Sequence, residues 1–391
     1  MFLESAPQSR YFKEEHQILR ESLREYVASE ISPYIEKWEE DGEVPRELYE
    51  KSGDVGLLGV GFPEQYGGAF EGDEFAKLVV GEELARAGSG GISAALGSHT
   101  IGLPPIIAAG GDVLRQRVVP PVLAGKKISA LAITEPGGGS DVASLRTSAR
   151  KDGTDYIING EKTFITSGMR ADFITVAVRT KPSSRGAEGV SLIVVEGDRQ
   201  GLERIQLKKM GWWSSDTATL RFNDYRVPAE NLLGTEHQGF KLIMNNFNSE
   251  RLGMSVMAYA FGQLCLDEAV NWARERKTFG LPLAERQVIR HKLVDMAMRI
   301  ESARAWTYDL AERVQNDEGT PNELVARTCM LKVLSTQAMQ FCADQAVQIL
   351  GGMGFMRGTI SERIYREVKV MMIGGGSEEI MKDLAARQLQ I

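Results

Sequence analysis

Apolar residues recur at helical spacing through the first third of the chain. The spacing predicts a first helix whose buried stripe is formed by Phe12, Ile18, Leu19, Leu23 and Val27. Similar patterns predict a second helix over residues 74–87 and a third after residue 112, with loops at the glycine- and proline-containing stretches 59–63 and 67–68. Residues 1–125 are therefore expected to form an N-terminal helical domain.

The pattern changes near residue 126, where short runs rich in β-branched residues replace the helical stripes. Strands are predicted over residues 156–160, 162–166, 173–179, 190–195 and 217–222. Asn159-Gly160 is expected to form a tight type I′ turn that joins the first two strands as a hairpin, because both residue types tolerate positive φ. Long crossover helices are missing from this region, which disfavours a parallel dinucleotide-binding sheet. We expect a small β-barrel or sandwich over residues 126–238.

Long helical stripes return after residue 239. Apolar and small residues step by alternating fours and threes through Ile289, Leu293, Met296, Ile300, Ala303, Thr307 and Leu310. Another helix is predicted to begin at Pro321, with Thr320 as its cap and Glu323 completing a capping box. This texture is typical of a helical bundle, so residues 239–391 are expected to form a C-terminal four-helix bundle.

Composition narrows the function classes. The chain has 391 residues, enough for about two to three domains of roughly 150 residues each. Its net charge is −7 without a basic block, so nucleic acid is not an expected partner. Three cysteines without CxxC spacing and four histidines without ligand spacing predict neither disulfides nor a metal site. No run of about eighteen apolar residues occurs, so membrane insertion is not expected.

The first ten residues lack the apolar core of a signal sequence, and acidic residues come early. A bacterial cytoplasmic location is therefore expected. A mitochondrial matrix protein in its mature form would look similar, and that alternative stays open.

Two motifs carry chemistry. Residues 130–141 read ALAITEPGGGSD, and residues 364–380 read IYREVKVMMIGGGSEEI after the QILGGMGF of residues 348–355. A lone glycine-rich turn is weak evidence, although glycines let backbone N–H groups approach a ligand. The first motif also lacks the Lys-Ser/Thr of a phosphate-binding loop. The two strings in this order resemble the two signatures of the acyl-CoA dehydrogenase family, and the likeness extends over essentially the whole chain.

The resemblance implies FAD as the cofactor and a set of flavin contacts. Thr134 would meet the flavin pyrimidine, Phe164 would stack on the ring where the family commonly has Trp, and Thr166 would lie near N5. Ser140 would meet the CoA pantetheine or the flavin phosphate region. The remaining implied FAD contacts are Arg276, Thr278 and Phe279, which would reach the FAD of a neighbouring subunit, Gln348 and Gly352 at its ADP end, and Ser377 and Glu379 beside the flavin.

The resemblance also implies where the catalytic base stands. Many family members carry a catalytic Glu where this chain has Gly375, but Glu250 stands where the long-chain and isovaleryl-type branch places it. Glu250 would remove the α-proton of a saturated acyl-CoA, and the Gly375 amide would bind the thioester carbonyl. Asn248 and Arg251 would contact the substrate. Burial would raise the pKa of Glu250 and Arg251 would lower it, so the direction of the net shift stays open.

The expected product is the trans-2-enoyl-CoA of fatty acid β-oxidation, with the β-hydride passing to flavin N5. By resemblance, electrons leave through electron-transferring flavoprotein, and the assembly is a homotetramer. Two alternatives stay open: a flavoenzyme of the same fold with oxidase activity or a non-CoA substrate, and an inactive CoA-ester-binding homologue. A glutamate taken at random from a helix is most often a solvated surface residue, so the assignment of Glu250 depends on the resemblance.

Overall fold

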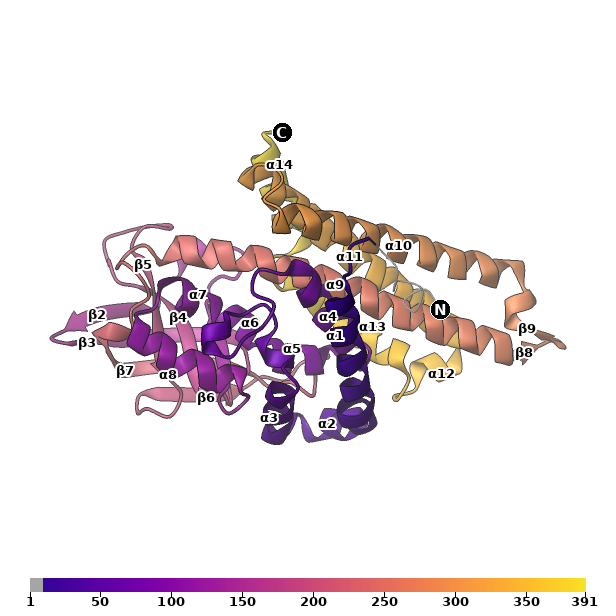
Figure 1. The fold of residues 1–391 in the computed structure, drawn as a ribbon, viewed down its shortest axis with the longest axis horizontal. Helices are drawn as coiled ribbons and strands as arrows, with labels where there is room; N and C mark the ends of the chain where they lie inside the picture. The colour runs from indigo at the N-terminus through magenta and orange to yellow at the C-terminus, as the bar shows by residue number, and fades with distance from the viewer. Residues whose placement is uncertain (1–9) are drawn as a thin grey trace.

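The computed structural model describes residues 10–391, in which a β domain and a long helical bundle lie on either side of an N-terminal helical region (Figure 1). The order of helical, β and helical regions agrees with the prediction. The first nine residues, on which most of the expectation about a leader rests, lie outside the described part.

The N-terminal region is more finely divided than the sequence indicated. The predicted helices form as α1, α4 and α8, and five further short helices lie between them. Ile18, predicted to face the core from α1, is 63 % exposed, whereas Leu23 is buried, so the stripe is narrower than expected. The helices are α1 (Glu14–Tyr26), α2 (Ile35–Asp41), α3 (Arg46–Asp54), α4 (Glu74–Ala85), α5 (Gly90–Gly97), α6 (His99–Gly102), α7 (Pro104–Ala109) and α8 (Asp112–Leu123).

The middle region is one mixed sheet of seven strands. Its hydrogen-bonded order is β1-β4-β2-β3-β7-β6, and β5 pairs with β4 on a branch. β1 and β2 each pair with β4 in parallel, and the other pairs are antiparallel. The strands are β1 (Ser129–Ala132), β2 (Ser148–Asp152), β3 (Asp155–Thr166), β4 (Phe173–Arg179), β5 (Val190–Glu196), β6 (Leu202–Gln206) and β7 (Thr217–Pro228).

The predicted hairpin at Asn159-Gly160 is wrong. β3 runs through both residues without turning, and its pairing with β7 shifts register there as a β-bulge. The Asn159 side chain exchanges hydrogen bonds with Asp224 across the pair. A Cβ on Gly160 would lie 2.6 Å from the Cα of Thr147, so glycine is needed for close approach of the backbones. The actual hairpin joins β2 to β3 through Gly153.

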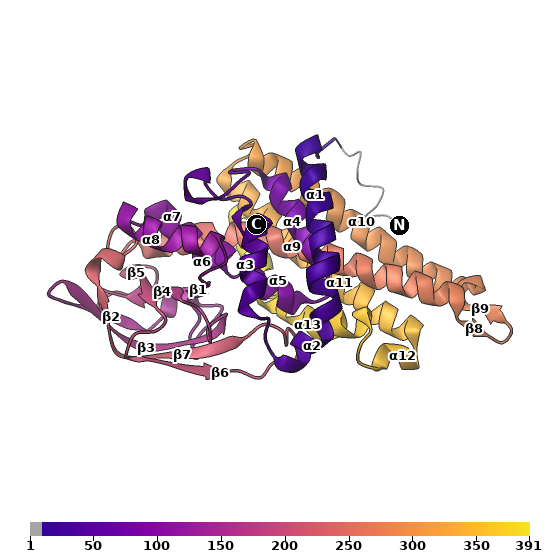
Figure 2. The ribbon, with the colours of Figure 1, turned by 60° about the horizontal axis from the view of Figure 1, so that its bottom comes forward.

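The C-terminal region is the predicted bundle of long helices. Thr320 caps α11 by accepting a hydrogen bond from the Glu323 amide, as the sequence indicated. Between α9 and α10 a two-stranded tip projects beyond the bundle in both views (Figures 1 and 2). The elements are α9 (Gly239–Glu275), β8 (Lys277–Thr278), β9 (Leu281–Pro282), α10 (Gln287–Gln315), α11 (Pro321–Leu350), α12 (Gly352–Phe355), α13 (Ile360–Ile373) and α14 (Glu378–Leu389).

Helix α9 connects all three regions. It starts beside β5, crosses the N-terminal helices and ends at the projecting tip (Figure 1). At 1.5 Å per residue its 37 residues span roughly 55 Å. Within residues 10–391 no single helix combines the length and apolar composition of a membrane span, although the bent pair Gly90–Gly97 and His99–Ala109 passes the same test jointly.

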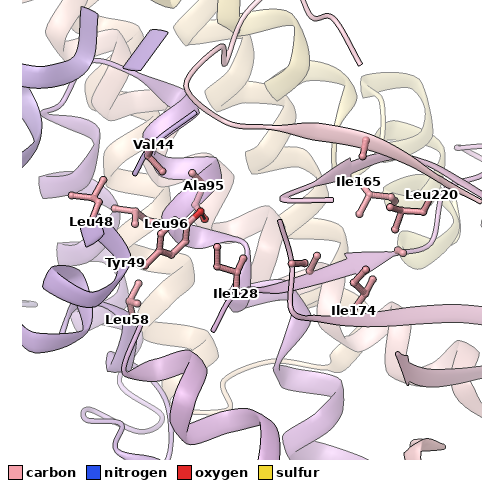
Figure 3. Close-up of a cluster of buried hydrophobic side chains, with 14 of the residues drawn as sticks. Val44, Leu48, Tyr49, Leu58, Ala95, Leu96, Ile128, Ile165, Ile174 and Leu220 are labelled. Atoms are coloured by element: carbon pink, nitrogen blue, oxygen red, sulfur yellow. Dashed lines mark hydrogen bonds between the residues drawn. The ribbon is translucent and has the colours of Figure 1, made fainter. Parts of the chain in front are cut away.

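The N-terminal helices and the sheet share one hydrophobic core. Figure 3 shows Leu48 and Tyr49 of α3 on one side, strand residues Ile174 and Leu220 on the other, and Ile128 between them. The Tyr49 hydroxyl donates to the Ala95 carbonyl at 3.2 Å, so the aromatic ring is buried without losing its polar partner. This shared core fixes the sheet relative to the helices that line the site.

A buried polar network fixes α4 against the bundle. Glu82 accepts hydrogen bonds of 2.6 Å from the hydroxyls of Tyr259 on α9 and Tyr308 on α10. Its second carboxylate oxygen lies 2.6 Å from a guanidinium nitrogen of Arg20 on α1. Because a buried carboxylate is costly without such partners, α4 is held in one position. That position matters because other residues of α4, among them Leu78 and Leu84, line the cavity described below.

Candidate active site

A cavity of about 620 Å³ lies where the three regions meet. Glu250 enters it from α9, and Thr166 and Trp212 enter it from the β domain. Most of the remaining lining is apolar and comes from α4, α5, α6, α7 and α9; it includes Leu84, Leu96, Ile101, Pro104, Leu252 and Met257. A mostly apolar hollow with a few polar groups is the usual form of a small-molecule site.

Glu250 and Gly375 lie side by side, as the relocation of the base requires. A Cβ built on Gly375 would stand 3.7 Å from Oε1 of Glu250 and 2.9 Å from Sδ of Met254. Gly375 has φ +65°, a conformation that suits glycine. Positions 250 and 375, far apart in sequence, thus lie next to each other in the structure, and Met254 fills part of the space that a side chain at 375 would need.

Glu250 is half-buried at the wall of the cavity, and its surroundings shift the pKa of its carboxyl group. Desolvation raises the pKa of its carboxyl group, and Arg251 and Lys332 act in the opposite direction without cancelling it. Within residues 10–391 the carboxylate takes no hydrogen bond from another group, so both oxygens are free to accept a proton. The sequence left the direction of the net pKa shift of Glu250 open, and in the structure desolvation is the larger effect.

The side chains of Arg251 and Lys332 hold the glycine loop 374–376 by donating hydrogen bonds to backbone carbonyls in and next to it. Arg251 donates from Nε to the Gly375 carbonyl at 3.0 Å and from a terminal nitrogen to Oδ1 of Asn248 at 3.1 Å. Lys332 of α11 is fully buried and donates from Nζ to the carbonyls of Gly376 at 2.8 Å and Met372 at 3.1 Å.

The sequence interpretation missed Lys332. Its signal was present, because a lysine inside the apolar run of residues 330–334 is an expected sign of a buried charge. Arg251 was expected to contact substrate. It is buried, and its hydrogen bonds go to the loop and to Asn248.

Trp212 is a second group that the sequence did not indicate. It adopts φ +56°, uncommon for a bulky side chain, and its indole packs on Gly90 at the start of α5. Glu367 of α13 holds this arrangement by accepting from the Trp212 amide at 3.1 Å and the Gly90 amide at 2.8 Å. Burial, and then the neighbouring Glu39, raise the pKa of Glu367 to about 7.

The predicted flavin contacts of the β domain lie together around the end of β3. The Thr163 amide donates to the Thr134 carbonyl at 2.9 Å, which joins the first motif to the segment that holds Phe164 and Thr166. Phe164 is 69 % exposed at φ +61°. Ser140 is exposed on the glycine-rich loop and does not line the cavity.

These residues fit FAD. An exposed aromatic face beside a cavity-lining hydroxyl offers a surface that a flat isoalloxazine ring can cover. The glycine-rich loop is open, because a Cβ on Gly137 would meet nothing within 4 Å. When bound, the flavin supplies the acceptor for a hydride.

The remaining predicted FAD contacts lie elsewhere in the chain. Arg276, Thr278 and Phe279 form the projecting tip, and Phe279 is 99 % exposed. Glu250 and the end of α9 at Glu275 are separated by roughly 38 Å along one helix. Two further groups complete the predicted set: Gln348 and Gly352 are exposed where α11 passes into α12, and Ser377 and Glu379 begin α14 beside the glycine loop.

The fold and the site define the class of protein. A half-buried carboxylate in a mostly apolar cavity, with a flavin-compatible surface on the neighbouring β domain, fits a flavin-dependent oxidoreductase with an apolar substrate.

Comparisons with known proteins identify the family. The chain matches the acyl-CoA dehydrogenase N-terminal domain over residues 13–126, the middle domain over 130–225 and the C-terminal domain over 237–390. The long-chain specific acyl-CoA dehydrogenase of Rattus norvegicus mitochondria is 38 % identical over 385 residues, which cover 97 % of this chain and 87 % of the rat protein.

Solved structures agree. A probable acyl-CoA dehydrogenase from Mycobacterium abscessus superposes with a TM-score of 0.93 at 47 % identity, covering 97 % of this chain and 100 % of that one. Butyryl-CoA dehydrogenase from Megasphaera elsdenii superposes with a TM-score of 0.91 at 29 % identity, covering 97 % and 99 %. The chain belongs to the acyl-CoA dehydrogenase family. It is an FAD-dependent oxidoreductase that acts on acyl-CoA thioesters.

Proposed function

We propose that Glu250 removes the α-proton of a saturated acyl-CoA. Bound FAD would accept the β-hydride at N5, and the product would be the trans-2-enoyl-CoA. The observation that carries the proposal is the 3.7 Å separation between Oε1 of Glu250 and a Cβ built on Gly375. The raised pKa of the Glu250 carboxyl makes it a stronger base than an exposed glutamate. Lining by apolar groups excludes water once an acyl chain is bound.

The Gly375 amide is proposed to bind the thioester carbonyl, and bound FAD would supply a second donor, a ribityl hydroxyl. Charge develops on that oxygen as the α-proton leaves, and a fixed donor stabilises it. Glycine at 375 keeps the amide while removing the side chain. Asn248 lies one turn from Arg251 and is proposed to meet the pantetheine.

The substrate is proposed to be a long or branched acyl-CoA. An extended, mostly apolar cavity of about 620 Å³ favours an apolar acyl group over a charged one. The rat relative is long-chain specific by name, which supports the same class.

Assembly as a homotetramer is part of the proposal. Because Arg276 and Phe279 lie at the tip, far along α9 from Glu250, a second copy would have to bring them to the flavin. The exposure of Phe279 and of Phe355 supports a surface that is covered by another copy. Electron-transferring flavoprotein is the proposed electron acceptor. The expected compartment, a bacterial cytoplasm or the mitochondrial matrix, stays a prediction.

An anaerobic titration tests the reaction. Saturated acyl-CoAs of graded length and branching are added to the FAD-loaded protein while the visible flavin spectrum is recorded. We expect bleaching, strongest with the best-fitting acyl group. Glu250→Gln should retain FAD and lose bleaching, whereas Glu21→Gln, an exposed change on α1, should behave as wild type. Bleaching at an undiminished rate in Glu250→Gln would exclude Glu250 as the base.

Oxygen separates the remaining alternatives. If the reduced protein is reoxidised by air at the rate of turnover, it is an oxidase of the same fold. If none of the acyl-CoAs bleaches the flavin, the non-CoA and inactive alternatives take the place of the proposal.

A further inference from the structure

The glycine loop has little conformational restraint of its own. It contains three consecutive glycines, and Gly375 and Gly376 both have positive φ. Glycine loses more conformational freedom on ordering than any other residue. Yet the proposed reaction needs the Gly375 amide and Glu250 in a fixed mutual geometry, since a displacement of about 1 Å can cost on the order of 10²-fold in rate.

Lys332, which does not line the cavity, supplies that restraint. Its Nζ donates to the Met372 carbonyl, at the end of α13, and to the Gly376 carbonyl, at the end of the loop. A cation at a helix C-terminus also interacts favourably with the helix dipole. The loop is therefore fastened at both ends by one ammonium group, and in its middle by the bond from Arg251 to the Gly375 carbonyl.

The charge of Lys332 also acts on the base. Lys332 favours the ionised form of Glu250. Lys332 itself faces Glu378 of α14, Arg251 and Glu250 of α9, and Cys329 of its own helix. Burial lowers the pKa of Lys332 to about 8, and Glu378 opposes that shift.

We propose that Lys332 is a positioning residue for proton abstraction: it holds the loop 374–376 against Glu250 and supports the carboxylate form of the base. The inference rests on the proposed function. It predicts that losing the ammonium group harms the chemical step more than substrate binding, and that the rate in the wild type declines as Lys332 gives up its proton above about pH 8.

The test compares Lys332→Met, which keeps the length of the side chain, with Lys332→Arg, which keeps the charge and the donors. Lys382→Met is the matched control, because it removes an exposed positive charge that is paired with Glu378 on the same helix α14. For each FAD-loaded protein we would measure FAD content, thermal stability, and kcat and KM over a range of pH.

A second readout isolates deprotonation. An acyl-CoA analogue with sulfur in place of the β-carbon has an acidic α-proton and no β-hydride to transfer. Its enolate, stacked on oxidised flavin, gives a long-wavelength charge-transfer band. The pH at which the band appears reports the apparent pKa of proton abstraction, which a purely structural lysine would not move.

We expect Lys332→Met to keep FAD, to lose about 10²-fold in kcat with a smaller change in KM, and to develop the band at higher pH. Lys332→Arg should regain part of the rate without the decline above about pH 8, and the control should match wild type. Wild-type kcat and band titration in Lys332→Met would overturn the inference. If Lys332→Met does not fold, Lys332→Arg decides the matter. The inference is then overturned if the rate of Lys332→Arg declines above about pH 8 as the wild-type rate does. A wild-type flavin that no acyl-CoA reduces would overturn the proposed function, whereas reduction with an unaffected Lys332→Met overturns this inference alone.

Discussion

Exchanging the residues at positions 250 and 375 should move the base without abolishing the reaction. In the double variant Glu250→Gly with Gly375→Glu, the new side chain starts 3.7 Å from the present position of Oε1 of Glu250. A carboxylate grown from that point can reach the same substrate carbon from a neighbouring origin. We therefore expect the double variant to recover part of the activity that Glu250→Gly loses.

The structure sets the cost of the exchange. A side chain at φ +65° carries left-handed strain of about 1–2 kcal/mol. The new Cβ would also stand 2.9 Å from Sδ of Met254, which must move, whereas its 3.9 Å approach to Cγ of Arg251 is ordinary contact. Overpacking of this kind costs about 1–3 kcal/mol. Adding Met254→Ala should relieve the contact and raise the recovered activity.

Anaerobic stopped-flow reduction of the flavin measures the outcome. Glu250→Gly should lower the reduction rate by about 10²–10⁴-fold, the usual contribution of a general base. The double variant should exceed it by at least about tenfold, a difference of ~1.4 kcal/mol. A double variant that retains FAD and binds acyl-CoA, yet reduces no faster than Glu250→Gly, would refute the claim that the two positions serve one carbon.

Three further predictions concern stability and the cofactor. Because the pKa of Glu367 is raised from 4.5 to about 7, the folded state binds the extra proton between those values, so the free energy of unfolding falls as pH rises through them. In urea titrations at stepped pH, the wild type should lose about 3 kcal/mol of unfolding free energy over this range, and Glu367→Gln should lose much less. An unchanged pH dependence of the unfolding free energy in Glu367→Gln would contradict this prediction. Arg276→Lys should reduce bound FAD, because lysine cannot bind phosphate oxygens bidentately, and full occupancy would argue against a phosphate contact at the tip. Gly160→Ala should destabilise by about 1–3 kcal/mol, since its Cβ would lie 2.6 Å from the Cα of Thr147, and an unshifted denaturation midpoint would contradict the bulge.

The sequence predicted what depends on periodicity and on recognisable strings. Apolar spacing predicted helix α10, the cap at Thr320 predicted the start of α11, and the two motifs indicated the family. It failed where a distant contact overrides a local preference. Asn159-Gly160 favours a turn in isolation, but a bulge against β7 and the close approach of Thr147 keep β3 extended.

The candidate active site likewise combines residues that the sequence indicated with contacts that it did not indicate. The sequence named Glu250 and Gly375, but their adjacency comes from the packing of α13 against α9. The restraint by Lys332 and the support of Trp212 by Glu367 join segments that lie 40 or more residues apart. No local pattern specifies such pairs, although a lysine or glutamate within an apolar stripe marks the positions to inspect.

The surroundings of Gly375 argue that the base was relocated and the site kept in use. A site that had merely lost its carboxylate would leave an empty space where the side chain had been, and empty space in a core is costly. Here Met254 occupies part of that space, and the carboxylate of Glu250 lies 3.7 Å from the Cβ position. The loop that lacks a side chain is held by Arg251 and Lys332, two buried cations whose desolvation has a large cost. Packing, restraint and charge therefore all centre on the space between Glu250 and Gly375, which supports the proposal of catalysis by Glu250 over the inactive alternative.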